Sequence, residues 1–140
     1  MVARTLLLAA FGVVCAAAAP TGTRSVLVTG ASGRTGKLLY AQLKARNDMK
    51  VKALVRASAD AKDKARTALN CTKCDASEGI FYGDVTIPSS LTASMAGVDT
   101  LAICVGVGET FNKTIMKGVE FIGVENQVQF NTRLVPSCLL

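Results

Sequence analysis

Short apolar runs alternate with longer stretches of helical spacing along most of this chain. The runs are rich in β-branched and other apolar residues, as is typical of strands buried on both faces of a parallel sheet. They span residues 26–28, 51–55, 80–82 and 101–105. Alternation of such runs with helical stretches predicts an α/β fold.

The stretches between the runs carry the patterns of helices. In the first of them, the residues at i, i+3, i+4 and i+7 form one stripe that we expect to pack against the sheet. This stripe consists of Gly36, Leu39, Tyr40 and Leu43. Further helices are expected over residues 59–69, 88–96 and 119–128, the second of these ending at Gly97.

A glycine-rich loop follows the first run, within the sequence SVLVTGASGRTG of residues 25–36. We expect Gly30 to allow a tight turn, Gly33 to let a ligand approach the backbone, and Gly36 to let the helix pack close to the strand. Unpaired N–H groups and the helix dipole favour an anion at such a helix start. The loop is therefore predicted to bind a pyrophosphate, although a bland glycine turn is the alternative. Further donors would come from Ser32, Arg34 and Thr35.

A dinucleotide loop after the first strand also predicts the arrangement of the sheet. Right-handed crossovers give a Rossmann-like, doubly wound parallel sheet with the strands in the order 3-2-1-4 and helices on both faces. Ligands of such sheets lie across the carboxyl ends of the strands. We therefore expect Cys104, Val105 and Gly106 to line the path toward a nicotinamide ribose. Cys104 is expected to be a packed wall residue rather than a nucleophile, since no base is near it in sequence.

Three segments resemble the NmrA-like, atypical short-chain dehydrogenase/reductase family of NAD(P)-binding proteins. They are VLVTGASGRTGKLLY, FYGDVT and FIGVENQV, within a resemblance that runs from about Ser25 to Val128. The resemblance implies that Asp84 and Val85 contact the adenine ring, with the carboxylate reaching the exocyclic amine. A turn and helix cap before Pro88 is the alternative role of these residues, and both roles can hold together.

The residue at the end of the second strand bears on the choice of cofactor. An NAD site uses an acidic residue about twenty positions after the loop to hold the ribose hydroxyls. Here that position is Arg56, and residues 51–59 contain no Asp or Glu. A guanidinium suits a 2′-phosphate, with Arg34 in support, so NADP is predicted in preference to NAD. The alternative is that Arg56 is a solvated charge at the strand end.

The chain has no His, which excludes His-based catalysis and His metal ligands. Cys71 and Cys74 form a CxxC pair that the family pattern lacks, without the second pair that a structural zinc site needs. A local disulfide or two surface thiols are the favoured interpretations, a redox-active pair is the alternative, and no metal site is predicted. Asn70 and Asn112 each begin a glycosylation sequon.

Catalytic residues are harder to place than cofactor-binding ones. The short-chain reductases that this chain resembles take a Tyr-x-x-x-Lys pair from a helix after the fifth strand, and the sequence offers only four strands. Tyr40 and Lys44 have the right spacing, but Tyr40 belongs to the sheet-packing stripe. The sequence therefore predicts a truncated NAD(P)-binding domain over residues 24–130, with an unstructured tail over 131–140. Two functions stay open: the cofactor-binding half of an oxidoreductase, or a non-catalytic binding module that associates through its open sheet edge.

The first nineteen residues are predicted to be a signal peptide. Arg4 precedes an apolar run over residues 6–19, which contains an Ala-x-Ala site at 16–18. This pattern predicts the secretory pathway, or a plastid where such a signal is the first half of a bipartite address; an uncleaved anchor is the alternative. The formal charge of +6 comes from scattered Lys and Arg residues, so no nucleic-acid partner is predicted. The apolar run is short for a membrane span, so no stable span is expected once the signal is removed.

Overall fold

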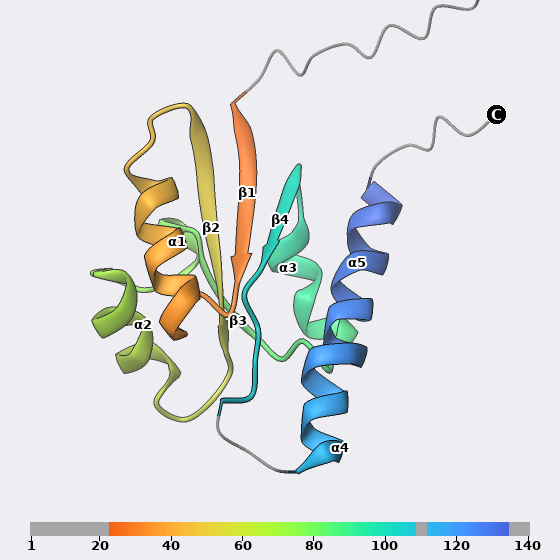
Figure 1. Cartoon of the computed structure of the whole chain (residues 1–140). Helices are drawn as coiled ribbons and strands as arrows, with labels where there is room; N and C mark the ends of the chain where they lie inside the picture. The colour runs from red at the N-terminus through yellow and green to blue at the C-terminus, as the bar shows by residue number, and fades with distance from the viewer. Residues whose placement is uncertain (1–22, 109–111, 135–140) are drawn as a thin grey trace, which may run out of the picture.

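The computed structural model of the chain describes residues 23–108 and 112–134, and it has a single parallel sheet between two layers of helices (Figure 1). The strand order is β3-β2-β1-β4, and all three pairings are parallel. The predicted α/β class and strand order are therefore confirmed. The strands are β1 (Arg24–Thr29), β2 (Met49–Arg56), β3 (Ile80–Gly83) and β4 (Thr100–Ile103).

Helices cover both faces of the sheet, as a doubly wound fold requires (Figure 1). On one face lie α1 (Arg34–Lys44) and α2 (Ala61–Leu69). On the other lies α3 (Thr92–Met95), which continues from a 3₁₀ turn at Pro88–Leu91. Beside it runs a long helix made of α4 (Lys113–Met116), a π-helical segment (Lys117–Ile122) and α5 (Gly123–Leu134).

Each face of the sheet has its own apolar core. Leu27 and Val28 are neighbours on β1 with no exposed surface, and they belong to different cores because successive side chains of a strand point to opposite faces. Val28 packs in the core under α1 and α2, which also contains Tyr40. Leu27 packs in the core under α3 and the long helix, together with Met95.

Several element ends differ from the sequence expectation. Strand β4 ends at Ile103 rather than at residue 105. The last helix begins near residue 113 rather than 119, because the Asn112 side chain accepts hydrogen bonds from the N–H groups of Thr114 and Ile115 and so caps it. It also continues to Leu134, so the predicted unstructured tail is wrong for residues 131–134.

The predicted signal peptide lies outside the described residues, as does the remainder of the predicted tail, residues 135–140. Among the helices of residues 23–108 and 112–134, none has the length and apolar character that a membrane crossing needs.

Candidate dinucleotide site

The glycine loop brings backbone of β1, α1 and β4 into close approach. Gly30 has φ +66°, and a Cβ there would lie 2.5 Å from the carbonyl oxygen of Cys104. A Cβ on Gly36 would collide with the carbonyl oxygen of Gly30. The two glycines therefore allow the tight turn and the close helix packing that the sequence predicts.

Gly33 differs from these two glycines because its φ of −74° is open to any residue. A Cβ there would lie 3.1 Å from the Gly30 carbonyl oxygen, which is tight but not prohibitive. Gly33 is the N-cap residue of α1, where no side chain makes a capping hydrogen bond and the first turn contains no acidic residue. No side chain of the described residues therefore caps the N–H groups at the start of this 11-residue helix or offsets its dipole, and both favour an anion there.

A cleft of about 350 Å³ opens beside this loop at the carboxyl ends of the strands. Residues from all four strand ends line it, as expected for a ligand site of a doubly wound sheet. Nine of the twelve predicted site residues lie in its wall: Gly30, Ser32, Gly33, Arg56, Asp84, Val85, Cys104, Val105 and Gly106.

The other three predicted residues have different positions. Gly36 is buried against Gly30 and shapes the loop from behind. Arg34 and Thr35 are exposed in the first turn of α1 and are not part of the cleft wall. Their contact with a cofactor stays a prediction.

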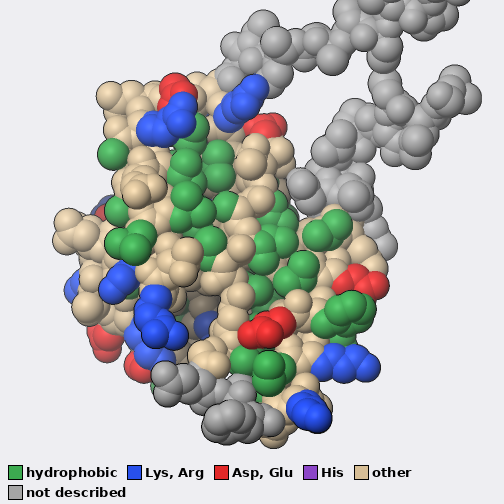
Figure 2. Space-filling view, in the orientation of Figure 1, with side chains coloured by type: hydrophobic (Ala, Val, Ile, Leu, Met, Phe, Trp, Pro, Cys, Tyr) green, Lys and Arg blue, Asp and Glu red, His purple; other side chains and the backbone are tan. Residues whose placement is uncertain are grey.

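Basic and hydroxyl side chains gather where β2 ends. Arg56, Ser58 and Lys64 all line the cleft, and Figure 2 shows basic side chains clustered at the lower left of the view, toward this end of the sheet. Lys64 forms an ion pair of 2.8 Å with Asp60, which also accepts a hydrogen bond of 2.7 Å from the Ser58 hydroxyl. These two hydrogen bonds, that of Lys64 first, lower the pKa of Asp60.

Asp84 and Val85 are held in the cleft by their own neighbours. Asp84 Oδ1 accepts hydrogen bonds from the backbone N–H of Thr86 at 2.8 Å and from its hydroxyl at 2.6 Å. These bonds, with a smaller contribution from the Arg56 charge, lower the pKa of Asp84. The Val85 carbonyl accepts a hydrogen bond of 3.0 Å from the Asn126 side chain. The turn role and the lining position of Asp84 are therefore both present.

Among the described residues that line the cleft next to β4, Cys104 is the titratable one. Cys104 is a half-buried free thiol, and desolvation raises its pKa, so the thiol form is favoured. Its N–H donates to the Thr29 carbonyl at 3.1 Å, which fixes the chain as it leaves β4. This arrangement fits the expected wall residue better than an activated nucleophile.

Tyr40 is unsuited to catalysis by its position. Its side chain is 4% exposed and packs in the core under α1, as the helical stripe predicts. Burial is the first cause of its raised pKa, with the Glu78 charge second. The Tyr40 and Lys44 pair therefore matches the reductase spacing without forming a site.

The CxxC pair lies away from the cleft, at the end of α2. Cys71 and Cys74 form a disulfide, which decides between the two interpretations that the sequence left open. Their sulfurs and the Glu78 carboxylate lie within 4.8 Å of one another. The sulfurs are bonded to each other, however, and the carboxylate accepts hydrogen bonds from three backbone N–H groups.

Sequence reasoning missed Ser58 and Lys64 as residues of the cleft. The Lys64 side chain is 58% exposed and lines the cleft. Ser58 could have been found from its position two residues after β2, where the chain crosses the carboxyl edge of the sheet. No comparable signal marks Lys64, which lies in α2.

The strand order, the glycine loop and the cleft define a dinucleotide-binding α/β domain, and comparison with known proteins agrees. A sequence profile of the family described as NAD(P)H-binding matches residues 30–131. The chain therefore belongs to this NAD(P)-binding family, the NmrA-like and atypical short-chain dehydrogenase/reductase group. A nicotinamide dinucleotide is accordingly its cofactor.

Two plant proteins are similar in sequence. An uncharacterised chloroplastic protein of Arabidopsis thaliana is 35% identical over 91 residues, which cover 65% of this chain and 25% of that protein. Sanguinarine reductase of Eschscholzia californica is 38% identical over 80 residues, covering 56% of this chain and 26% of the reductase. The chain thus matches about a quarter of the length of these curated relatives.

Solved structures share the fold at lower identity. An NADPH-bound carbonyl reductase from chicken fatty liver superposes with a TM-score of 0.61 at 20% identity, over 81% of this chain and 48% of the reductase. The terminal R domain of the myxalamid biosynthetic pathway superposes with a TM-score of 0.65 at 20% identity, over 82% and 33% of the two chains.

Proposed function

We propose that this domain binds NADPH in preference to NADH and is the cofactor-binding half of a reductase. The observation that carries the preference is Arg56, which lines the cleft at the end of β2 with Ser58 and Lys64 beside it. A 2′-phosphate would meet a planar guanidinium fork, an ammonium and a hydroxyl there. The nearest acidic side chain along the chain, Asp60, is already paired with Lys64.

The remaining cleft residues suggest how the other parts of the cofactor are held. The pyrophosphate would lie over Ser32 and Gly33 at the start of α1, and the adenine against Asp84 and Val85. Val105 and its neighbours would line the nicotinamide end. The cofactor supplies hydride transfer, while this chain's own residues bind and orient it.

Calorimetry on the native protein and on Arg56→Asp, each with both cofactors, tests the preference. A charge-assisted contact contributes a factor of about ten to a hundred in affinity, so native protein should favour NADPH by that ratio. Arg56→Asp should reverse the order, because a carboxylate repels the phosphate and can accept from ribose hydroxyls. Lys50→Asp is the matched control, since it makes the same charge change near the opposite end of β2.

Equal affinity of native protein for the two cofactors would refute the role of Arg56. Loss of both cofactors in Arg56→Asp but not in Lys50→Asp would mean that Arg56 positions the whole dinucleotide. No binding of either cofactor to folded native protein would refute the cofactor role itself.

A non-catalytic dinucleotide-binding module is the second candidate, favoured by the chemistry of the cleft end next to β4. Among the described residues that line this end, Cys104 is the one titratable group, and its pKa is raised. Sequencing the full transcript separates the two functions. A reading frame that continues into a further strand and helix supports the reductase half, whereas a transcript that encodes only these 140 residues supports the module.

We also propose that the N-terminal segment targets the chain to the secretory pathway, and onward to a plastid where that address is bipartite. The apolar run behind Arg4 and its Ala-x-Ala site support the first step. The chloroplastic relative supports the second. N-terminal sequencing of native protein should find a start near residue 20, and an intact Met1 on cytosolic protein would refute the proposal.

A further inference from the structure

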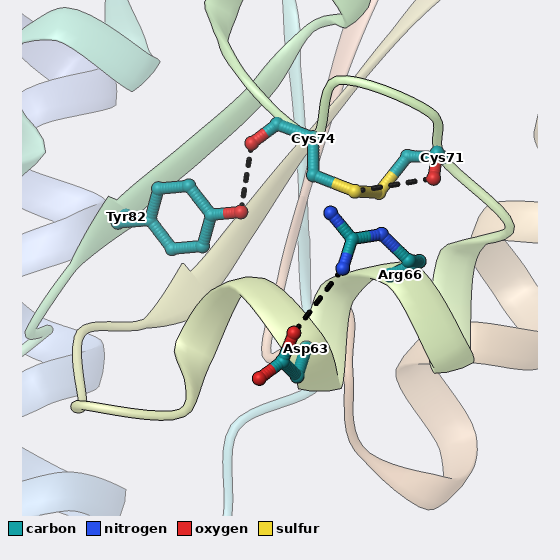
Figure 3. A network of polar contacts seen from close by, with 5 residues as sticks. All are labelled: Asp63, Arg66, Cys71, Cys74 and Tyr82. Atoms are coloured by element: carbon teal, nitrogen blue, oxygen red, sulfur yellow. Dashed lines mark hydrogen bonds and ion pairs between the residues drawn. A yellow bond between two sulfur atoms is a disulfide. The ribbon is translucent and has the colours of Figure 1, made fainter.

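The disulfide loop between α2 and β3 has two sulfurs in different surroundings. Cys74 is 1% exposed and belongs to the core under α1 and α2, whereas Cys71 is half-buried at the edge of that core. Figure 3 shows the disulfide at the loop, with the Arg66 guanidinium pointing toward it. Cys71 is therefore the more accessible of the two cysteines to an attacking thiolate.

Other bonds hold this loop in place independently of the disulfide. The Glu78 carboxylate accepts hydrogen bonds from the N–H groups of Thr72, Lys73 and Cys74, at 3.3, 3.1 and 2.8 Å. The Tyr82 hydroxyl donates to the Cys74 carbonyl at 2.8 Å. Because these bonds involve no sulfur, they persist when the disulfide opens and keep the two sulfurs together.

The structure also provides a partner for the reduced form. Cys74 Sγ lies 3.2 Å from the carbonyl oxygen of Cys71 (Figure 3). A disulfide sulfur has no proton to donate, so this contact becomes a hydrogen bond only when Cys74 is a thiol. The buried thiol would therefore have an acceptor already in place.

A purely structural role explains the pair less well. A cross-link that closes a ring of four residues restricts the unfolded chain less than one that closes a long loop. The loop is in addition already held by Glu78 and Tyr82. A cross-link with one partly accessible cysteine is more open to attack by a thiolate than a fully shielded structural disulfide.

We propose that Cys71 and Cys74 form a thiol–disulfide exchange centre that a protein dithiol reduces by attack at Cys71. The incoming thiolate forms a mixed disulfide with Cys71 Sγ and releases Cys74 as a thiolate. The second thiolate of the dithiol then attacks its own partner sulfur and releases Cys71. The external dithiol is oxidised to a disulfide, and the pair gains two electrons and takes up two protons from solvent.

Trapping the mixed disulfide tests the site of attack. The probe is a thioredoxin whose second active-site cysteine is replaced by serine, incubated with the full oxidised chain carrying Cys15→Ser, Cys104→Ser and Cys138→Ser. These changes leave Cys71 and Cys74 as the chain's remaining cysteines. Peptide mapping should place the adduct on Cys71. An adduct mainly on Cys74, or none on the folded chain, would overturn the proposal, and the unsubstituted chain run in parallel gives the same map if the triple variant fails to fold.

Reoxidation of the dithiol tests the scaffold. Glu78→Gln removes the carboxylate that gathers the three N–H groups, so disulfide re-formation with oxidised glutathione should slow about tenfold, the factor that one charge-assisted hydrogen bond contributes. Glu125→Gln, the same change at an exposed position of α5, should re-form at the native rate. Equal rates in all three proteins would overturn the proposed scaffold. Neither test involves a dinucleotide, so both stand apart from the proposed cofactor.

Discussion

At the residue scale, Gly30 of the glycine loop must be a glycine for two separate reasons. Gly30 needs a positive φ, and it also needs the space that a side chain would fill against Cys104. Gly97 has a similar φ of +64°, but a Cβ there would meet nothing within 4 Å. A side chain at either position would strain the backbone, but only a side chain at Gly30 would also collide with neighbouring atoms.

We predict that Gly97→Ala lowers the free energy of unfolding by about 1 kcal/mol, the cost of the left-handed conformation. Gly30→Ala should lower it by about 2 to 4 kcal/mol, because a backbone collision adds to that strain. Urea denaturation of both variants measures the difference. Equal losses would mean that the β4 backbone can move aside.

The second prediction at this scale concerns Asp84 and pH. Its folded-state pKa lies below the ordinary value of 3.8, mainly because Thr86 donates to it. Its contribution to stability is thus fully present above that value and is lost as the pH falls through the lower folded pKa. Asp84→Asn should cost at most about 1 kcal/mol near neutral pH, after allowance for solvent screening. The gap to native protein should narrow as the pH falls from neutral to below 3.8. Urea denaturation across this range checks it, and a gap independent of pH would contradict it.

How far the sequence predicts the site depends on how each residue reaches the cleft. Gly30 and Arg56 were predictable because strand ends of a doubly wound sheet converge on one edge. Lys64 was not, because it reaches the cleft through the course of a loop and the first turn of α2, which spacing does not encode. The pairing of Cys71 with Cys74 was likewise open, since it depends on the path of the chain after Asn70.

At the element scale, the long C-terminal helix is fitted closely to the cleft. A Cβ on Gly123 would lie 2.7 Å from Val85 Cγ2, and Asn126, one turn along, donates to the Val85 carbonyl. This helix therefore supports the turn that carries Asp84 and Val85. A glycine inside a helix is otherwise unfavourable, so close packing explains its presence here.

We predict that Gly123→Ala destabilises the protein by about 1 to 3 kcal/mol through overpacking against Val85. Val85→Ala should relieve part of that loss in the double variant, giving a non-additive cycle. Gly118→Ala is the control, because its Cβ would meet only the Thr86 methyl group at 3.9 Å. It should leave stability unchanged or raise it by up to about 1 kcal/mol. Additive effects of Gly123→Ala and Val85→Ala would contradict this packing.

Element boundaries were harder to predict than element identities for a physical reason. The apolar run at residues 101–105 extends past the end of the neighbouring strand. Strand β1 ends at Thr29, which pairs with Ile103, so β4 also ends there. The start of the last helix depends on the Asn112 cap rather than on apolar periodicity. Both boundaries depend on contacts with neighbouring residues in the fold. The type of each element, by contrast, can be predicted from the pattern of apolar residues within its own segment.

At the scale of the whole molecule, the order of strands leaves β4 with β1 as its one partner among the described residues. Leu101 and Ile103 of this strand are half-buried, and Figure 2 shows hydrophobic side chains at the surface beside the long helix. Exposed apolar side chains of that helix include Ile115, Phe121, Ile122 and Val128. The sequence predicts this open edge because crossover handedness alone places β4 on the outside.

The last prediction is that the 140-residue chain, when isolated, associates through the β4 edge. An unpaired strand edge presents free N–H and C=O groups to another chain. Since the Cys104 N–H points to β1, alternation along the strand directs the Ile103 N–H to the open side. Ile103→Pro should therefore block association without removing a bond to β1, whereas Ala102→Pro should break the ladder and unfold the domain.

In sedimentation velocity, native protein should sediment faster as its concentration rises, and Ile103→Pro should stay monomeric. A native chain that is monomeric and stable at every concentration would contradict association through the β4 edge.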